Sequence, residues 1–104
     1  MREAKVFYKD KFVGYLKEKD EGYSFKYDEA YLNDNAKSIS LLLPLRKEEY
    51  FSAVLFPFFD GLIPEGYLYN LAIKKWKIDY IDRFGVLLKT SKDSIGAVSL
   101  EEVI

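Results

Sequence analysis

The strongest constraint on the fold of this chain is an alternation of aromatic and polar residues. Tyr23, Phe25 and Tyr27 occupy every second position, so an extended strand places all three rings on one face. A shorter alternation and an apolar run precede them, and turn-forming residues that include Gly22 separate the three segments. The pattern predicts a three-stranded antiparallel meander over about residues 4–27.

The middle of the chain predicts a loop and a further strand. Residues 28–36 are polar and predict a loop with a short helical turn. The leucine-rich segment 38–43 predicts a strand, which Pro44 ends because proline cannot donate a backbone hydrogen bond. Residues 46–50 are mostly charged and are expected to form an exposed connection.

The C-terminal half changes to a helical period. Three helices are expected, which begin in turn near Ser52, Pro64 and Asp79, with Pro57 in the first turn of the first helix. Their apolar positions at helical spacing are Phe56, Phe59 and Leu62, then Leu68, Leu71 and Ala72, then Ile81, Phe84, Leu87 and Leu88.

The order of strands, helices and a last strand predicts an α+β domain. Gly96 is expected to break the chain before a closing strand over residues 97–103. We expect a small antiparallel, barrel-like sheet of about five strands, with two to three helices in the C-terminal half. The 104 residues suffice for one hydrophobic core, so residues 1–104 are expected to form a single domain.

The residue inventory excludes several classes of function. The chain has no cysteine and no histidine, which excludes disulfides, thiolate nucleophiles and Cys/His zinc sites. Lys and Arg number 16 against 17 Asp and Glu, whereas nucleic-acid binders usually carry a basic excess. No direct nucleic-acid binding is therefore expected. Without a signal-peptide pattern or a membrane-length apolar segment, we expect a cytoplasmic protein with no membrane contact, metal or cofactor.

Without histidine, acid–base catalysis would depend on carboxylates, lysine or tyrosine. Asp60 and Glu65, on either side of residues 61–64, form the best carboxylate pair. They can be an acid and a base across a cleft. The favoured alternative is a turn at Asp60 and a first helical turn at Glu65, where the helix dipole suits a negative charge. No Ser-x-x-Lys motif, phosphate-binding glycine loop or kinase His-Arg-Asp motif occurs, so no catalytic residue is expected.

The segment FPFFDGLIPEGYL, residues 56–68, combines four aromatic side chains with two glycines and two prolines. Glycine and proline fix the path of the backbone, and binding residues often lie on such segments. The alternative is a helix–helix junction with buried phenylalanines. The two interpretations are compatible if some rings are buried and others point outward.

The same segment carries a resemblance to a known family. FPFFDGLIPEG is similar to the phenylalanine-rich Leu-Pro-Glu-Gly segment in the N-terminal region of HipA-like serine/threonine toxin kinases. Residues 38–45 resemble the family's Ser-x-Ser-Leu-x-Leu-Pro-Leu segment, and residues 93–98 resemble its Asp-x-x-Gly-Ala-Val ending. The opening hairpin, residues 6–28, also matches. These motifs occur in the family's order over nearly the whole chain.

The sequence departs from the family in three respects. Tyr67 follows Pro-Glu-Gly where the family often has tryptophan, and Ser91 replaces a glycine. The kinase core that follows this module in the family has no counterpart in the 104 residues. Kinase activity is therefore not expected.

The resemblance implies a regulator of a toxin kinase. In the family's three-gene systems this module is a separate antitoxin, HipS, beside a short kinase, HipT, and a DNA-binding HipB. Related toxins phosphorylate glutamyl-tRNA synthetase, halt translation and promote persistence. The expected partner is a HipT-like or HipA-like kinase core, whose active site this chain is expected to block. Contact with a HipB-like protein is expected only through that complex. The expected contact residues, centred on Tyr67, are Phe58, Phe59, Asp60, Pro64, Glu65, Gly66 and Tyr67.

Three other functions stay open at this stage. The chain can be a structural N-terminal fragment of a HipA-like kinase, needed for folding or for assembly with HipB but not inhibitory. An independent enzyme is disfavoured by the residue inventory. A DNA-binding regulator is disfavoured by the balanced charge.

Overall fold

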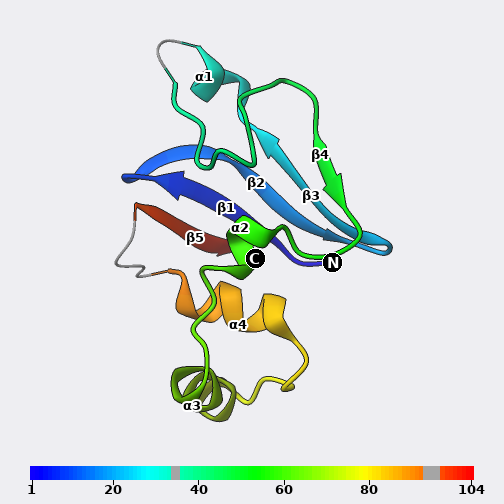
Figure 1. The fold of residues 1–104 in the computed structure, drawn as a ribbon, viewed down its shortest axis with the longest axis vertical. Coiled ribbons are helices and arrows are strands. Elements are labelled where there is room, and N and C mark those ends of the chain that lie inside the picture. The colour runs from blue at the N-terminus through cyan, green and yellow to red at the C-terminus, as the bar shows by residue number, and fades with distance from the viewer. Residues whose placement is uncertain (34–35, 93–96) are drawn as a thin grey trace.

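The computed structural model describes residues 1–33, 36–92 and 97–104 (Figure 1). Three strands come first, followed by a short helix, a short strand, three helices and a last strand. The elements are β1 (Glu3–Tyr8), β2 (Lys11–Lys19), β3 (Gly22–Tyr27), α1 (Glu29–Leu32), β4 (Tyr50–Ser52), α2 (Pro57–Asp60), α3 (Tyr67–Trp76), α4 (Arg83–Thr90) and β5 (Val98–Val103).

The sheet confirms the predicted α+β class and the number of strands. Its strands are all antiparallel and lie in the order β4-β3-β2-β1-β5, so the predicted meander forms the centre. The barrel-like closure that the sequence suggested is absent from the described residues. Because β4 and β5 lie at opposite edges and β4 has only three residues, the sheet stays open (Figure 1).

The hydrophobic core lies between one face of the sheet and the helices α2 and α4. Phe25 of β3 contacts Phe59 of α2, with ring centroids 5.5 Å apart. Tyr23 contacts Phe84 of α4 at the same distance. The alternation seen in the sequence therefore produces the expected result: the aromatic rings of β3 point to the core, and Lys26 between them is exposed.

The prediction of a strand over residues 38–43 is wrong. The segment contains a turn, in which the Leu43 amide donates to the Ser40 carbonyl at 3.1 Å. The buried Tyr27 hydroxyl donates to the Leu43 carbonyl and accepts from the Ile39 amide, so Ile39 and Leu43 are buried without strand pairing. The fourth strand is β4 instead, which begins at Tyr50, the last residue of the expected exposed connection, and ends at Ser52, where a helix was expected to begin.

The helices begin at different residues from those predicted. Ser52 lies in β4, although Pro57 does open α2 in its first turn. Gly66 precedes α3, so the helix starts three residues after Pro64. Asp82 rather than Asp79 caps α4, because its carboxylate accepts from the Gly85 amide at 3.0 Å.

The apolar stripes also differ from the prediction. Phe84, Leu87 and Leu88 of α4 are buried as expected, but Ile81 is 82% exposed. On α3, Leu68 and Leu71 are exposed, and the buried residues are Tyr69 and Ala72. The closing strand is confirmed as β5, and Gly96 lies outside the described residues.

A network of charged side chains attaches α4 to the sheet. The Arg2 guanidinium donates to Glu18 of β2 at 2.8 Å and to both carboxylate oxygens of Asp82 at 2.9 Å. It also lies 5.2 Å from the centre of the Phe84 ring. The hydrogen bonds from Arg2 lower the pKa of the Glu18 and Asp82 carboxyls. The N-terminus of α4 is therefore held firmly against β1 and β2.

Candidate functional site

The segment 56–68 is anchored in the core by two of its phenylalanines. Phe56 is 6% exposed and Phe59 is fully buried. The ring of Phe58, which is half-buried, meets the Phe59 ring edge-on with centroids 5.2 Å apart. These contacts leave α2 little freedom to move relative to the sheet. Phe59 therefore supports the segment from inside and offers no surface to a partner.

The backbone leaves the core at residues 64–66 and turns into α3. Pro64 is half-buried, and Glu65 and Gly66 are exposed. Gly66 has φ +60° and ψ −128°, a conformation that residues with a side chain rarely adopt. A Cβ atom at Gly66 would meet nothing within 4 Å, so the need for glycine is conformational and not steric. The turn presents the next residue, Tyr67, at the start of α3.

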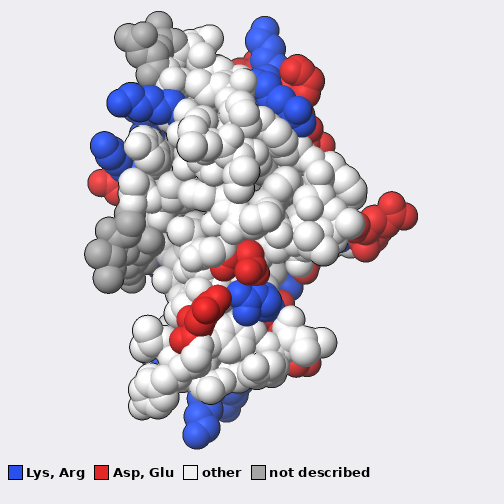
Figure 2. All heavy atoms as spheres, in the orientation of Figure 1, with Lys and Arg blue, Asp and Glu red and all other residues white. Residues whose placement is uncertain are grey.

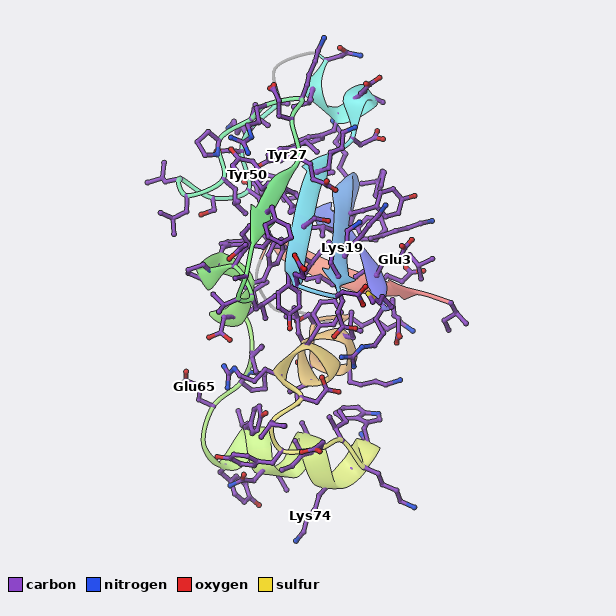
Figure 3. The ribbon with its side chains drawn as sticks, turned by 90° about the vertical axis from the view of Figure 1, so that its right-hand side faces the viewer. Glu3, Lys19, Tyr27, Tyr50, Glu65 and Lys74 are labelled. Carbon is purple, nitrogen blue, oxygen red and sulfur yellow. The ribbon has the colours of Figure 1, made fainter. Side chains whose placement is uncertain are left out.

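Helix α3 leaves several of its large apolar side chains exposed. Tyr67 is 74% exposed, Leu68 61% and Leu71 43%. Tyr69 and Ala72 face inward and are each 5% exposed. Figure 3 shows α3 at the far end of the molecule from the sheet, beyond α4, with Glu65 on the connection that leads into it. The outward face of α3 thus combines a tyrosine and two leucines next to the fixed turn.

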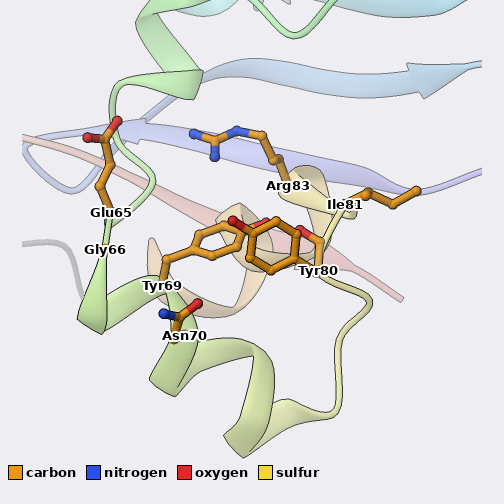
Figure 4. A pocket seen from close by; sticks show the side chains of 7 residues that line it. All are labelled: Glu65, Gly66, Tyr69, Asn70, Tyr80, Ile81 and Arg83. Atoms are coloured by element: carbon orange, nitrogen blue, oxygen red, sulfur yellow. The ribbon is translucent and has the colours of Figure 1, made fainter.

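A cleft of about 560 Å³ lies beside this turn (Figure 4). Its aromatic wall consists of Tyr69 and Tyr80, whose rings meet edge-on with centroids 5.5 Å apart. The Tyr69 hydroxyl donates to the Tyr80 carbonyl and so ties α3 to the chain before α4. The lining residues are Glu65, Gly66, Tyr69, Asn70, Tyr80, Ile81 and Arg83.

An ion pair closes the upper side of the cleft. Arg83 Nε donates to Asp60 Oδ1 at 2.8 Å, and the Arg83 guanidinium lies 5.4 Å from the centre of the Tyr69 ring. The hydrogen bond to Asp60 raises the pKa of the Arg83 guanidinium, which stays charged. Figure 2 shows acidic and basic groups together in the hollow between the sheet and α3, on a face that is otherwise largely uncharged.

The structure separates the predicted contact residues into two groups. Glu65, Gly66 and Tyr67 lie together on the surface, with Pro64 beside them. Phe58, Phe59 and Asp60 lie on α2, where Phe59 belongs to the core and Asp60 is paired with Arg83. Asp60 and Glu65 therefore do not form a free carboxylate pair, because Asp60 is paired with Arg83. The first helical turn expected at Glu65 is wrong, since α3 begins only at Tyr67.

Sequence reasoning missed five parts of this surface: Tyr69, Asn70, Tyr80, Ile81 and Arg83. Ile81 was assigned to a buried stripe. Tyr80 and Arg83 reach Glu65 only because α3 and α4 fold back on each other, which no local pattern reveals. The exposed pair Tyr80-Ile81 before the Asp82 cap was the one available signal.

No cluster of three or more acidic residues in the described part of the chain can hold a metal ion. No helix among the described residues is both long and apolar enough to cross a membrane.

Comparisons with known proteins agree with one another over almost the whole chain. Residues 4–101 match the family model described as HipA N-terminal domain. An uncharacterized protein of Haemophilus influenzae (strain KW20 / Rd) is 34% identical over 102 residues, which cover 98% of this chain and 93% of that protein. A solved structure, the N-terminal domain of HipA toxin, superposes with a TM-score of 0.78 and 30% identity, covering 100% of this chain and 94% of that one. The chain therefore belongs to the HipA N-terminal domain family, which is related to the non-catalytic part of the toxin.

Proposed function

We propose that this chain is a stand-alone HipA N-terminal module that binds a HipT-like serine/threonine kinase and inhibits it as an antitoxin. The observation that carries the proposal is the setting of Tyr67. Its side chain is 74% exposed, although it follows a glycine with a positive φ angle and a segment anchored in the core. Large aromatic side chains held on a rigid backbone are typical anchors of protein interfaces.

The surface around Tyr67 supports a protein partner over a small substrate. Leu68 and Leu71 extend the apolar area along α3, and Tyr80 and Ile81 extend it on the other side of the cleft. Exposed apolar residues gathered in this way, next to polar groups, usually mark an interaction site. We infer that Tyr67 enters the kinase active site and that its neighbours form the surrounding contact.

The proposal includes no catalytic role for this chain. Histidine and cysteine are absent from the sequence, and Asp60 is occupied by Arg83. The balanced charge of the chain supports contact with DNA only through a HipB-like partner of the kinase. We place the complex in the cytoplasm.

Co-expression with a HipT-like kinase from the same genome tests the function. We expect the chain to restore growth, to co-purify with the kinase and to suppress its phosphorylation activity. A stable complex that neither restores growth nor lowers kinase activity would identify an assembly subunit, which is the alternative function. Absence of both a complex and rescue would contradict the proposal.

A further inference from the structure

We propose that the cleft beside Tyr67 receives a positively charged side chain, a lysine or an arginine, of the partner protein. The proposal rests on the function above, in which the surface around Tyr67 contacts a kinase. It adds a second point of recognition, in which the partner inserts a side chain into this chain while Tyr67 enters the partner. The groups that carry it are Glu65, Asn70 and Tyr80.

The first argument is the charge within the cleft. Two ionised side chains line the cleft, Glu65 and Arg83, and Asp60 lies beside it as the ion-pair partner of Arg83. Arg83 is neutralised by Asp60, with which it shares a hydrogen bond of 2.8 Å. Among the residues that the structure describes, Glu65 makes no ion pair. Glu65 also attracts Arg83 across the cleft, but together with Asp60 these groups leave one net negative charge, which a cation complements.

The second argument is the chemistry of the walls. The Tyr80 ring is 65% exposed, and its edge-on contact with Tyr69 leaves ring surface open to the cleft. The face of an aromatic ring attracts a cation, and lysine and arginine use this contact in proteins. The cleft already contains one such contact, because the Arg83 guanidinium lies over the Tyr69 ring. Asn70 adds an amide oxygen that can accept from an ammonium or guanidinium group.

The third argument is size and rigidity. A cleft of about 560 Å³ has room for a long side chain, since ligand pockets commonly span roughly 300–1,000 Å³. Pro64 fixes its own φ angle directly before Glu65, and the Tyr69 hydroxyl donates to the Tyr80 carbonyl and so holds the Tyr80 backbone. Tyr80 is thus held in place before a partner arrives, which lowers the entropic cost of binding.

An anion fits the same cleft poorly. Arg83 and the first amides of α3 carry positive charge, but Asp60 already pairs with Arg83, and the Glu65 carboxylate lines the same cleft. A bound anion would have to displace Asp60 from Arg83 and approach Glu65 against repulsion. The arrangement therefore selects a cation.

Substitution of Glu65 tests the inference in the complex. Glu65→Gln keeps the shape of the side chain and removes its charge, so we expect the affinity for the kinase to fall about tenfold. The affinity of the variant should also depend less on salt concentration, which loss of packing alone would not cause. Glu101→Gln on β5, an exposed glutamate away from the cleft, is the matched control and should leave affinity unchanged.

The outcomes separate this inference from the proposed function. Loss of binding by Tyr67→Ala with an unchanged affinity for Glu65→Gln would overturn the cleft inference and leave the function standing. If Tyr67→Ala and Glu65→Gln both bind the kinase as tightly as the native chain, the result contradicts the cleft inference and the proposed function alike.

A probe that needs no kinase provides a second test. Nα-acetyl-arginine amide and Nα-acetyl-lysine amide can be titrated into the isotope-labelled chain and followed by NMR. We expect saturable shifts at Glu65, Asn70 and Tyr80, which Glu65→Gln abolishes and the neutral Nα-acetyl-norleucine amide does not reproduce. Shifts of equal size with norleucine, or none with either cation, would contradict the inference even if the kinase binds elsewhere.

Discussion

Helices α3 and α4 are neighbours and are both rich in apolar residues, but they use these residues in opposite ways. Helix α4 has eight residues and buries five in a row, Phe84 to Leu88. Helix α3 has ten residues and buries only Tyr69 and Ala72, while Tyr67, Leu68 and Leu71 face solvent. Both follow a helical period, so periodicity alone does not tell a core helix from one that presents a surface.

The difference follows from where each helix is attached. Helix α4 packs against the sheet, and its N-terminus is held by Arg2, which bridges Glu18 and Asp82. Helix α3 packs mainly on α4 and lies beyond it, so one of its faces has no neighbour within the described residues (Figure 1). We infer that α4 serves the stability of the domain and α3 serves its interaction with a partner.

The largest predicted effect is a loss of stability caused by a substitution in α4. Phe84→Ala removes a buried ring that contacts Tyr23 and Arg2, so the free energy of unfolding should fall by about 3–5 kcal/mol. Chemical denaturation measures this loss. A loss below about 1 kcal/mol would mean that α4 is not part of the core as described, and the contrast with α3 would fail.

Gly66→Ala should have the next largest effect. Alanine at φ +60° is strained, so we expect a loss of about 1–3 kcal/mol, or a local rearrangement that moves Tyr67. Gly61 has φ −66°, so Gly61→Ala is the control and should cost less. Denaturation and kinase affinity should be measured together. Unchanged stability and affinity in Gly66→Ala would show that the turn does not position Tyr67.

The Arg2 network should make stability depend on pH. Because the pKa values of Glu18 and Asp82 are lowered in the fold, their contribution is complete above their ordinary values near 4 and is lost as pH falls through the lowered values. Arg2→Met should cost on the order of 1 kcal/mol at neutral pH. The difference from the native chain should shrink towards pH 3, and a constant difference across this range would contradict the role of Arg2.

The smallest predicted effect on stability is on α3. Leu71→Ser changes an exposed side chain, so unfolding free energy should stay within about 0.5 kcal/mol of the native value. Affinity for the kinase should nevertheless fall, because apolar contact is lost. A loss of stability above about 2 kcal/mol would place Leu71 in the core and remove the distinction between the two helices.

Much of the fold was predictable from short-range patterns. The alternation around Phe25 places β3, and with it the meander, because one buried face fixes which residues point inward. Segment 38–43 was predicted wrongly because its leucines suggest a strand. In the structure it forms a turn at Ser40, which the Tyr27 hydroxyl holds through the Leu43 carbonyl. Strand β4 has three residues and exists through its pairing with β3, which its own sequence does not reveal.

The candidate site was predictable only in part. The glycines and prolines of residues 56–68 indicated a fixed backbone, and Tyr67 does lie exposed at its end. The burial of Phe59 and the pairing of Asp60 with Arg83 depend on how α2 meets the sheet and α4. Such contacts join residues far apart in the chain, so no local pattern predicts them.

The most direct test of the account is the affinity of Tyr67→Ala for a HipT-like kinase, measured together with its unfolding free energy. Phe51→Ala is the matched control. Phe51 is also an exposed aromatic residue, but it lies on β4, an edge strand of the sheet, and not on α3. We expect Tyr67→Ala to lose about 2–4 kcal/mol of binding free energy with stability nearly unchanged, and Phe51→Ala to bind normally. Binding by Tyr67→Ala within about a factor of two of the native chain would contradict the central claim.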